Sequence, residues 1–223
     1  MKLRVSRGVS TIEFAFSLLV LVPLVLGTGA IGINMIRTLQ TIQLARDAGH
    51  MYGRGVDLSD PGVQSILATL GTNLGLSTTP GAGKAEVILS ALTYVDANAC
   101  AAGGYADSHG NPTSGCANLN QWVFAQRIVI GDTDLRTSNF GSPLTSGPNG
   151  VTLDSSGRIT VAQYVSRTGA VAQFSSINPY SVVNNNVSGL PSGQKVYLSE
   201  AAAWGFGMPP FVSGGPTYAF AFF

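Results

Sequence analysis

Glu13 is the residue of this chain whose position has the clearest chemical consequence. It stands at the edge of an apolar segment, because residues 14–36 contain no Asp, Glu, Lys or Arg. An ionised carboxylate loses several kcal/mol of hydration free energy in hydrocarbon, so an acid here is costly unless something uses its charge. We therefore interpret Glu13 as a functional residue.

The two cysteines form the second chemical pair. Cys100 and Cys116 lie in one Gly-rich loop, and a pair of cysteines in an exported protein most simply forms a disulfide. Such a bond would stabilise the fold by about 3 kcal/mol by restricting the unfolded chain. The alternative is a metal site completed by His109, but zinc sites usually have a fourth ligand and more closely spaced cysteines. We expect a structural disulfide and no metal.

The remaining polar residues show no catalytic spacing. His50 is expected near the end of a helix, where it complements the helix dipole, and His109 is expected in a solvated loop. Asp132 and Asp134 could bind calcium weakly, although an Asx turn is favoured. The sequence contains no nucleophile elbow, phosphate loop or dinucleotide fingerprint. We predict no cofactor, no small-molecule substrate and no enzymatic activity, while a triad assembled across loops stays open.

The composition limits the class of protein. A chain of 223 residues suits one ordinary domain and a membrane helix. Charged residues make up 10% and the formal net charge is +1, so the chain lacks the basic surface that nucleic-acid binding requires. Hydrophobic residues at 45% support a core. The 28 glycines, together with the Asn, Ser and Thr residues that crowd the second half, favour turns, loops and strands over long helices.

The N-terminal region has the pattern of a membrane span. Basic residues precede the uncharged segment 14–36, which is long enough to cross a bilayer core of about 20 helical residues. This charge distribution predicts a cytoplasmic N-terminus and an exported C-terminal region. Pro23 predicts a kink or a looser stretch within the segment.

An apolar stripe predicts that the helix continues beyond the membrane. The helix is expected from about residue 10 to about residue 52, roughly 60 Å at 1.5 Å per residue, and repeated glycines at 49, 53 and 55 are expected to end it. Its second half should pack on a domain through residues spaced three or four apart. These residues are Ile31, Met35, Leu39, Ile42 and Ala45.

The sequence of the exported region predicts one helix followed by strands. Asp60 should cap a helix that begins at Pro61 and ends near residue 73. Strands are expected over 85–95 and 121–130, paired antiparallel, with the cysteine loop between them. Weaker predictions cover the later part of the chain: strands at 158–165, 194–198 and 217–223, an irregular connection at 137–150 and a helical turn at 170–177. The aromatic face of the last strand is expected to be buried, or else to meet partner subunits.

The segment Gly8-Val9-Ser10-Thr11-Ile12-Glu13-Phe14 resembles the processing site of type IV prepilins, most closely the tight-adherence (Tad/Flp) branch. The resemblance implies cleavage by a membrane peptidase between Gly8 and Val9, which leaves Glu13 as the fifth and Phe14 as the sixth mature residue. The new ammonium of Val9 and the carboxylate of Glu13 are then opposite charges at one depth, and a low-dielectric bundle strengthens their attraction. In this family the Glu of an entering subunit is thought to meet the N-terminus of its neighbour.

The chain looks like a TadE-like minor pilin, or pseudopilin, because major Flp pilins are very short and this chain has a large domain after its helix. The resemblance implies a leader at 1–8, a helix at 9–55 and an exported α+β domain at 56–223, with the long helix packed on an antiparallel sheet. The implied partners are a prepilin peptidase, other pilin subunits, assembly-platform proteins and the inner membrane. Val9 and Phe14 differ from the residues commonest in related branches.

Three alternatives remain at this stage. An ordinary signal peptide would use the apolar run 14–26 and cleavage after Ala30, releasing an exported surface or binding domain. An uncleaved signal anchor is the second alternative, and an unrecognised periplasmic enzyme is the third. Neither the signal peptide nor the signal anchor explains the five-residue spacing between Gly8 and Glu13.

Overall fold

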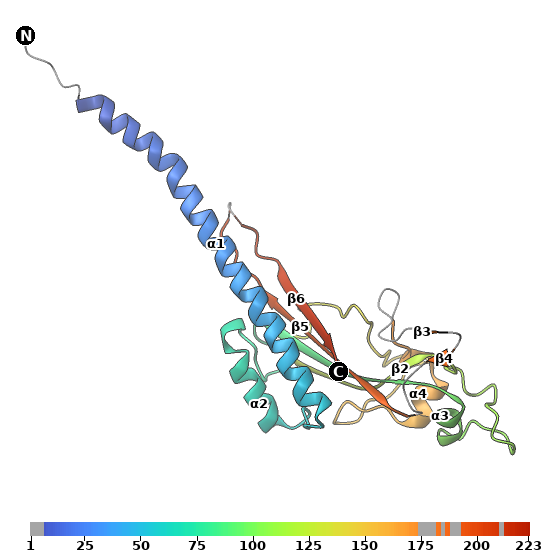
Figure 1. Cartoon of the computed structure of the whole chain (residues 1–223). Coiled ribbons are helices and arrows are strands. Elements are labelled where there is room, and N and C mark those ends of the chain that lie inside the picture. The colour runs from blue at the N-terminus through green and yellow to red at the C-terminus, as the bar shows by residue number, and fades with distance from the viewer. Residues whose placement is uncertain (1–6, 174–181, 184–185, 188–192, 210–211) are drawn as a thin grey trace, which may run out of the picture.

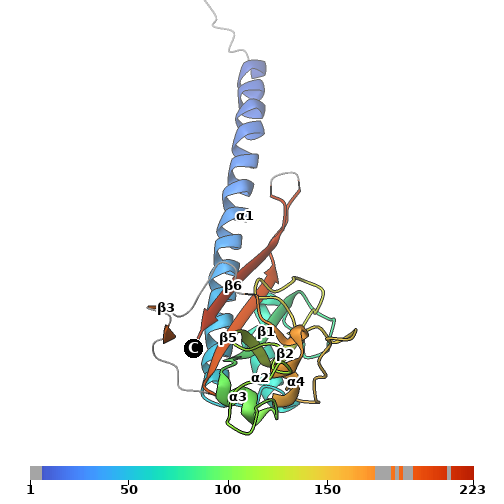
Figure 2. The same ribbon diagram turned by 90° about the vertical axis from the view of Figure 1, so that its right-hand side faces the viewer.

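The N-terminal helix projects from a domain that packs on its C-terminal half (Figures 1 and 2). The computed structural model describes residues 7–173, 182–183, 186–187, 193–209 and 212–223, of which 7–11, 182–183 and 186–187 are described by backbone alone. In chain order the elements are α1 (Arg7–Gly53), α2 (Pro61–Leu70), η1 (Thr72–Leu74), β1 (Ala85–Tyr94), α3 (Ala97–Ala102), β2 (Trp122–Gly131), α4 (Val161–Ser166), η2 (Thr168–Ala170), β3 (Val182–Val183), β4 (Asn186–Val187), β5 (Lys195–Trp204) and β6 (Pro216–Phe222). The chain is therefore α+β, as its sequence predicts.

Helix α1 confirms the predicted long helix. It is continuous through Pro23, and neither Figure 1 nor Figure 2 shows a sharp bend, so the predicted kink is not observed, while the alternative of a looser stretch stays a prediction. A single proline removes one backbone donor, and the turns on both sides carry the helix across the gap. The helix ends at Gly53, and Gly55 then adopts a φ of 81°, which glycine allows at little cost. Gly49 lies inside the helix and does not end it.

The face of α1 that packs on the domain differs from the predicted stripe. Ile31, Met35 and Leu39 are 57%, 64% and 60% exposed, so the first three members of the stripe point away from the domain. The last two members pack as predicted, since Ala45 is buried in the core and Ile42 packs against it. The packed face carries buried or half-buried residues, several of them polar. They are Ala30, Asn34, Arg37, Thr41, Leu44, Ala45, Ala48 and Tyr52. Apolar spacing did not identify this face because the domain supplies hydrogen-bond partners for its polar members.

Small residues allow α1 to approach the sheet closely. The strands present Ala201, Ala203 and Ala219 to the core that contains the C-terminal part of α1. At Gly49 the fit is tighter still, because a Cβ atom there would lie 2.0 Å from Cε2 of Phe223. Close packing of this kind tolerates little added volume.

Helix α2 begins where the sequence predicts. The Asp60 carboxylate accepts hydrogen bonds from the backbone N–H groups of Gly62 and Val63, at 2.7 and 3.2 Å. These contacts satisfy two of the donors that an α-helix leaves free at its first turn. Gly71 interrupts the predicted span, and the short helix η1 follows it.

Four antiparallel strands form the sheet, in the order β2-β1-β5-β6. The predicted pairing of β1 with β2 is confirmed, with Glu86 opposite Gly131 and Tyr94 opposite Trp122. Strand β5 extends well beyond the predicted 194–198. Strand β6 lies at an edge of the sheet, and Phe220 on its aromatic face is 39% exposed, so burial of that face is incomplete.

Two predicted elements take other forms. Residues 158–165 do not form a strand: Arg158 makes one isolated bridge to Gln126, and helix α4 starts at Val161. The helical turn predicted at 170–177 is instead the short helix η2, which ends at Ala170, and residues 174–177 lie outside the described part of the chain. Alternating β-branched and polar residues cannot distinguish a strand from a short amphipathic helix. The irregular connection at 137–150 is confirmed.

Candidate functional site

The residues of the prepilin-like motif lie in the first turns of α1. Gly8 and Val9 are within the helix, whose backbone is described from Arg7 onward. Glu13 and Phe14 are exposed, and Phe14 is 64% exposed. No described residue donates a hydrogen bond to the Glu13 carboxylate or forms an ion pair with it. Any partner for this charge must therefore come from outside the described part of the chain.

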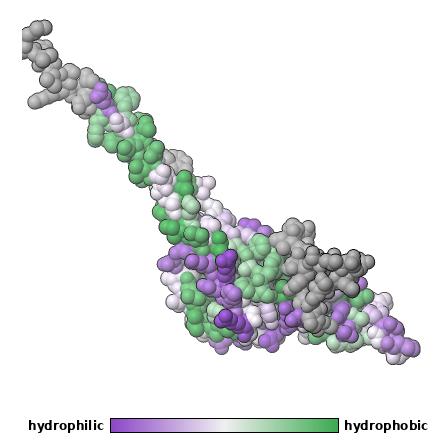
Figure 3. All heavy atoms as spheres, viewed as in Figure 1, coloured by the Kyte–Doolittle hydropathy of each residue, from purple (hydrophilic) through white to green (hydrophobic). Residues whose placement is uncertain are grey.

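The first half of α1 is a long apolar rod. Among its large apolar side chains, those between Ile12 and Leu26 are at least 40% exposed. Figure 3 shows this apolar surface extending away from the domain. The helix is long and apolar enough to cross a membrane. Burial of apolar surface is favourable by about 25 cal/mol per Å², so this half of α1 would be stabilised by an apolar environment that the described part of its own domain does not supply.

A buried charge network, which sequence reasoning missed, lies on the sheet face opposite α1. Arg127 of β2 and Glu200 of β5 lie on opposite sides of β1, with Nη1 of Arg127 3.9 Å from Oε2 of Glu200. The Arg127 guanidinium also donates to Ser90 Oγ at 3.1 Å. Glu200 accepts hydrogen bonds from Ser138 Oγ and Tyr218 Oη, both at 2.6 Å. Each charge is thus paired, which buried ions require.

Glu86, at the start of β1, is the least satisfied member of this network. It is 2% exposed, and its carboxylate accepts one hydrogen bond, from the backbone N–H of Arg136 at 3.2 Å. Burial raises the pKa of Glu86 to about 7, against the lowering effects of the Arg136 bond and the Arg127 charge. Burial lowers the pKa of Arg127, and the two glutamates oppose this effect. Burial, followed by the bond to Glu200, raises the pKa of Tyr218.

The network holds a loop against the sheet beside a cavity. Arg127 donates to the backbone oxygen of Gly141 and to Ser142 Oγ, both at 3.1 Å, so the loop after β2 is fastened by charged groups. A cavity of about 430 Å³ lies between this loop and the strands, with Glu86 and Arg127 in its lining. The arrangement stabilises the loop and leaves one carboxyl group that titrates near neutral pH. Single charges within apolar strand patterns were the sequence signal that could have revealed it.

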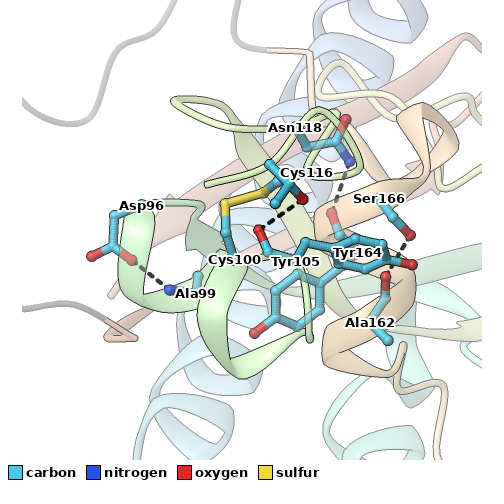
Figure 4. The surroundings of a disulfide bond; sticks show 10 residues. Asp96, Ala99, Cys100, Tyr105, Cys116, Asn118, Ala162, Tyr164 and Ser166 are labelled. Carbon is cyan, nitrogen blue, oxygen red and sulfur yellow. Dashed lines mark hydrogen bonds between the residues drawn. A yellow bond between two sulfur atoms is a disulfide. The ribbon is translucent and has the colours of Figure 1, made fainter. Parts of the chain in front are cut away.

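The predicted disulfide is present. Cys100 of α3 and Cys116 are bonded and buried, and their sulfurs therefore do not serve as thiolate ligands beside His109 (Figure 4). Asp96 caps α3 through the N–H of Ala99 at 2.8 Å. No group of three His, Cys, Asp or Glu residues within the described chain is placed to hold a metal ion. The disulfide ties α3 to the loop that follows it.

The other predicted positions have local structural roles. His50 lies in the last turn of α1, with its ring centroid 4.5 Å from that of Phe223. His109 is exposed in the cysteine loop. Asp132 accepts a hydrogen bond from the N–H of Asp134 at 3.3 Å, which is the predicted Asx turn.

Comparisons with protein families, with curated proteins and with solved structures give no match for this chain. The interpretation of its function therefore depends on its own residues and geometry.

Proposed function

We propose that this chain is a TadE-like minor pilin, or pseudopilin, of a tight-adherence pilus assembly and secretion system, with a structural role and no catalysis. One observation carries the proposal. Glu13, five residues after Gly8, has no partner among the described residues and stands at the head of an exposed apolar helix that continues into an α+β domain.

The Glu13 carboxylate has no partner of opposite charge among the described residues. A charge at the edge of an apolar helix is stabilised by an opposite charge at the same depth, and the ammonium that cleavage after Gly8 would create on Val9 is such a charge. Exposure of Phe14 and the apolar residues after it suits packing against other apolar helices or lipid. The proposal therefore gives Glu13 a role in assembly with a neighbouring subunit.

The proposed organisation follows the same reasoning. Residues 1–8 are the leader, residues 9–55 the helix with its span at 14–36, and residues 56–223 the exported domain with a pilin-like arrangement of helix on sheet. Before assembly the chain crosses the inner membrane once, with its N-terminus in the cytoplasm, since basic residues precede the span. Its partners are a prepilin peptidase, other pilin subunits and assembly-platform proteins.

The continuity of α1 supports this proposal over ordinary signal-peptide cleavage. Ala30 is 2% exposed and lies within the unbroken helix, on the face that meets the domain. Cleavage after Ala30 would remove the apolar half of α1 together with Glu13. It would also remove Ala30 itself from the face of α1 that packs on the domain.

The native N-terminus tests the proposal. Mass spectrometry of the mature chain is expected to find Val9 as the first residue, and Gly8→Ala is expected to leave the uncleaved precursor in the membrane. Gly27→Ala is the matched control, because a Cβ atom at Gly27 meets nothing within 4 Å, and it should be processed normally. A mature chain that begins at Ile31 would overturn the proposal.

A further inference from the structure

The β5–β6 hairpin extends beyond the rest of the domain toward the N-terminal half of α1, in both views of the molecule (Figures 1 and 2). Past Trp204, the last residue of β5, two-stranded pairing resumes between Met208 and Val212. Their backbones exchange hydrogen bonds of 2.9 and 3.0 Å. The extension is thus a narrow hairpin tip, described over residues 205–209 and 212–215, with backbone pairing of its own.

Side chains of α1 hold this hairpin at a defined position along the helix. Asn34 donates from Nδ2 to the backbone oxygen of Phe206 at 3.0 Å and accepts from its N–H at 2.6 Å. One turn later Arg37 donates to the backbone oxygen of Trp204 at 2.7 Å. Ala30, one turn before Asn34, is 2% exposed. The domain therefore covers α1 within the uncharged segment 14–36.

The position of Asn34 sets the depth of the hairpin tip. A bilayer core of about 30 Å takes about 20 helical residues, so a span that starts at Phe14 leaves the core close to Asn34. Phe206, which is hydrogen-bonded to Asn34, then lies at the edge of the core, and the paired residues Met208 and Val212 lie further toward the membrane. The sequence of the tip fits that place, since residues 201–223 contain no Asp, Glu, Lys or Arg.

Interfacial residues lie directly behind the tip. Trp204 is 42% exposed, and it lines a hollow of about 620 Å³ together with Arg37 and Lys84. Tryptophan is enriched at membrane interfaces, and Lys and Arg near an anionic leaflet interact favourably with phosphate groups. The uncharged tip is therefore followed by one level of the molecule that holds the tryptophan and both cations, since Arg37 donates to the backbone oxygen of Trp204 and the Trp204 N–H donates to the backbone oxygen of Lys84. This arrangement suits acyl chains at the tip and the interface with headgroups behind it.

We propose that Phe206, Met208 and Val212, in the described part of the β5–β6 hairpin tip, insert into the outer interface of the phospholipid bilayer that α1 crosses. The chain then has two membrane contacts, the span and the hairpin, and the second contact fixes the rotation and tilt of the domain above the lipid. This inference rests on the proposed function, because it requires α1 to be a membrane span.

Tryptophan quenching in vesicles tests the insertion. The chain has two tryptophans, so Trp122→Phe leaves Trp204 as the only one. The full chain is reconstituted in phosphatidylcholine and phosphatidylglycerol vesicles that contain lipid brominated near the headgroup end of the acyl chain. We expect the emission of Trp204 to be quenched relative to vesicles without bromine.

The second tryptophan provides the matched control. Trp122 pairs with Tyr94, the last residue of β1. Ala85, the first residue of β1, pairs with Ala203, which lies next to the hairpin tip. The two ends of β1 are about 30 Å apart at 3.3 Å per residue. Trp204→Phe therefore reports on Trp122 alone, and we expect its emission to be unchanged by the brominated lipid.

Two charge substitutions separate insertion from general contact with lipid. In the Trp122→Phe chain, Met208→Asp is expected to abolish the quenching of Trp204, while the chain stays in the membrane fraction. Leu119→Asp is the control, since Leu119 is 36% exposed and lies near Trp122 at the far end of the sheet. It should leave the quenching of Trp204 unchanged.

Three outcomes overturn the inference. If the chain resists carbonate extraction but Trp204 is not quenched, the hairpin does not insert, and the proposed membrane span stands. If Trp122 is quenched as strongly as Trp204, the domain lies on lipid without a specific contact. If the chain is released as a soluble protein, α1 is not a span, and both the inference and the proposed function fail.

Discussion

Glu86→Gln should remove a specific pH dependence of stability. Burial raises the pKa of Glu86 from 4.5 to about 7. A carboxyl group whose pKa is higher in the folded than in the unfolded chain binds protons more strongly when folded. Its contribution to stability is therefore fully present below pH 4.5 and is lost as the pH rises through 7.

The magnitude follows from these two values. One pKa unit corresponds to about 1.4 kcal/mol, so the change from 4.5 to about 7 is worth about 3 kcal/mol at most. The adjoining cavity of about 430 Å³ admits solvent, which screens the charge and reduces the effect to about 2 kcal/mol. For a domain of this size that energy corresponds to a change of about 4–8 °C in Tm.

Thermal unfolding of the full chain in detergent measures the effect. Between pH 4.5 and pH 8 the Tm of the wild-type protein should fall by about 4–8 °C relative to Glu86→Gln. Asp134→Asn is the matched control, because Asp134 lines the same cavity but is exposed, and it should keep the wild-type dependence. Parallel Tm curves for the wild type and Glu86→Gln would refute the reasoning.

Other predictions concern assembly, the disulfide and the contact of α1 with the sheet. Glu13→Gln should insert in the membrane yet fail to enter pili or assembly machinery, and co-purification with native pilin subunits measures this; unchanged incorporation would contradict the role of the charge. Replacing Cys100 and Cys116 with serine should lower the free energy of unfolding in urea by about 3 kcal/mol, since the bond joins residues 16 apart; an unchanged urea midpoint would argue against this. Gly49→Ala should cost about 1–3 kcal/mol through its clash with Phe223, and Phe223→Ala in the same chain should recover part of the loss; a Gly49→Ala protein as stable as the wild type would show that the ring moves aside freely.

Local sequence signals predicted several elements of this fold. The extent of α1, the cap of α2 at Asp60 and the strands over 85–94 and 122–131 follow from periodicity, capping chemistry and β-propensity within short windows. The disulfide followed from the number of cysteines and the expected compartment. Each of these features depends on residues that are close together in the chain.

Long-range pairing decided what the sequence left open. The packed face of α1 contains Asn34 and Arg37 because the β5–β6 hairpin, more than 160 residues later, supplies the backbone groups that bind them. The sequence likewise does not predict that three charges meet, because they come from three strands and come together only when β1 lies between β2 and β5. These charges are Glu86, Arg127 and Glu200. A charge in a strand pattern has no predicted partner until strand order and register are set. The sequence by itself thus determined the apolar rod, its carboxylate and the local elements, and the tertiary structure decided which faces and charges meet, since that depends on contacts between distant segments.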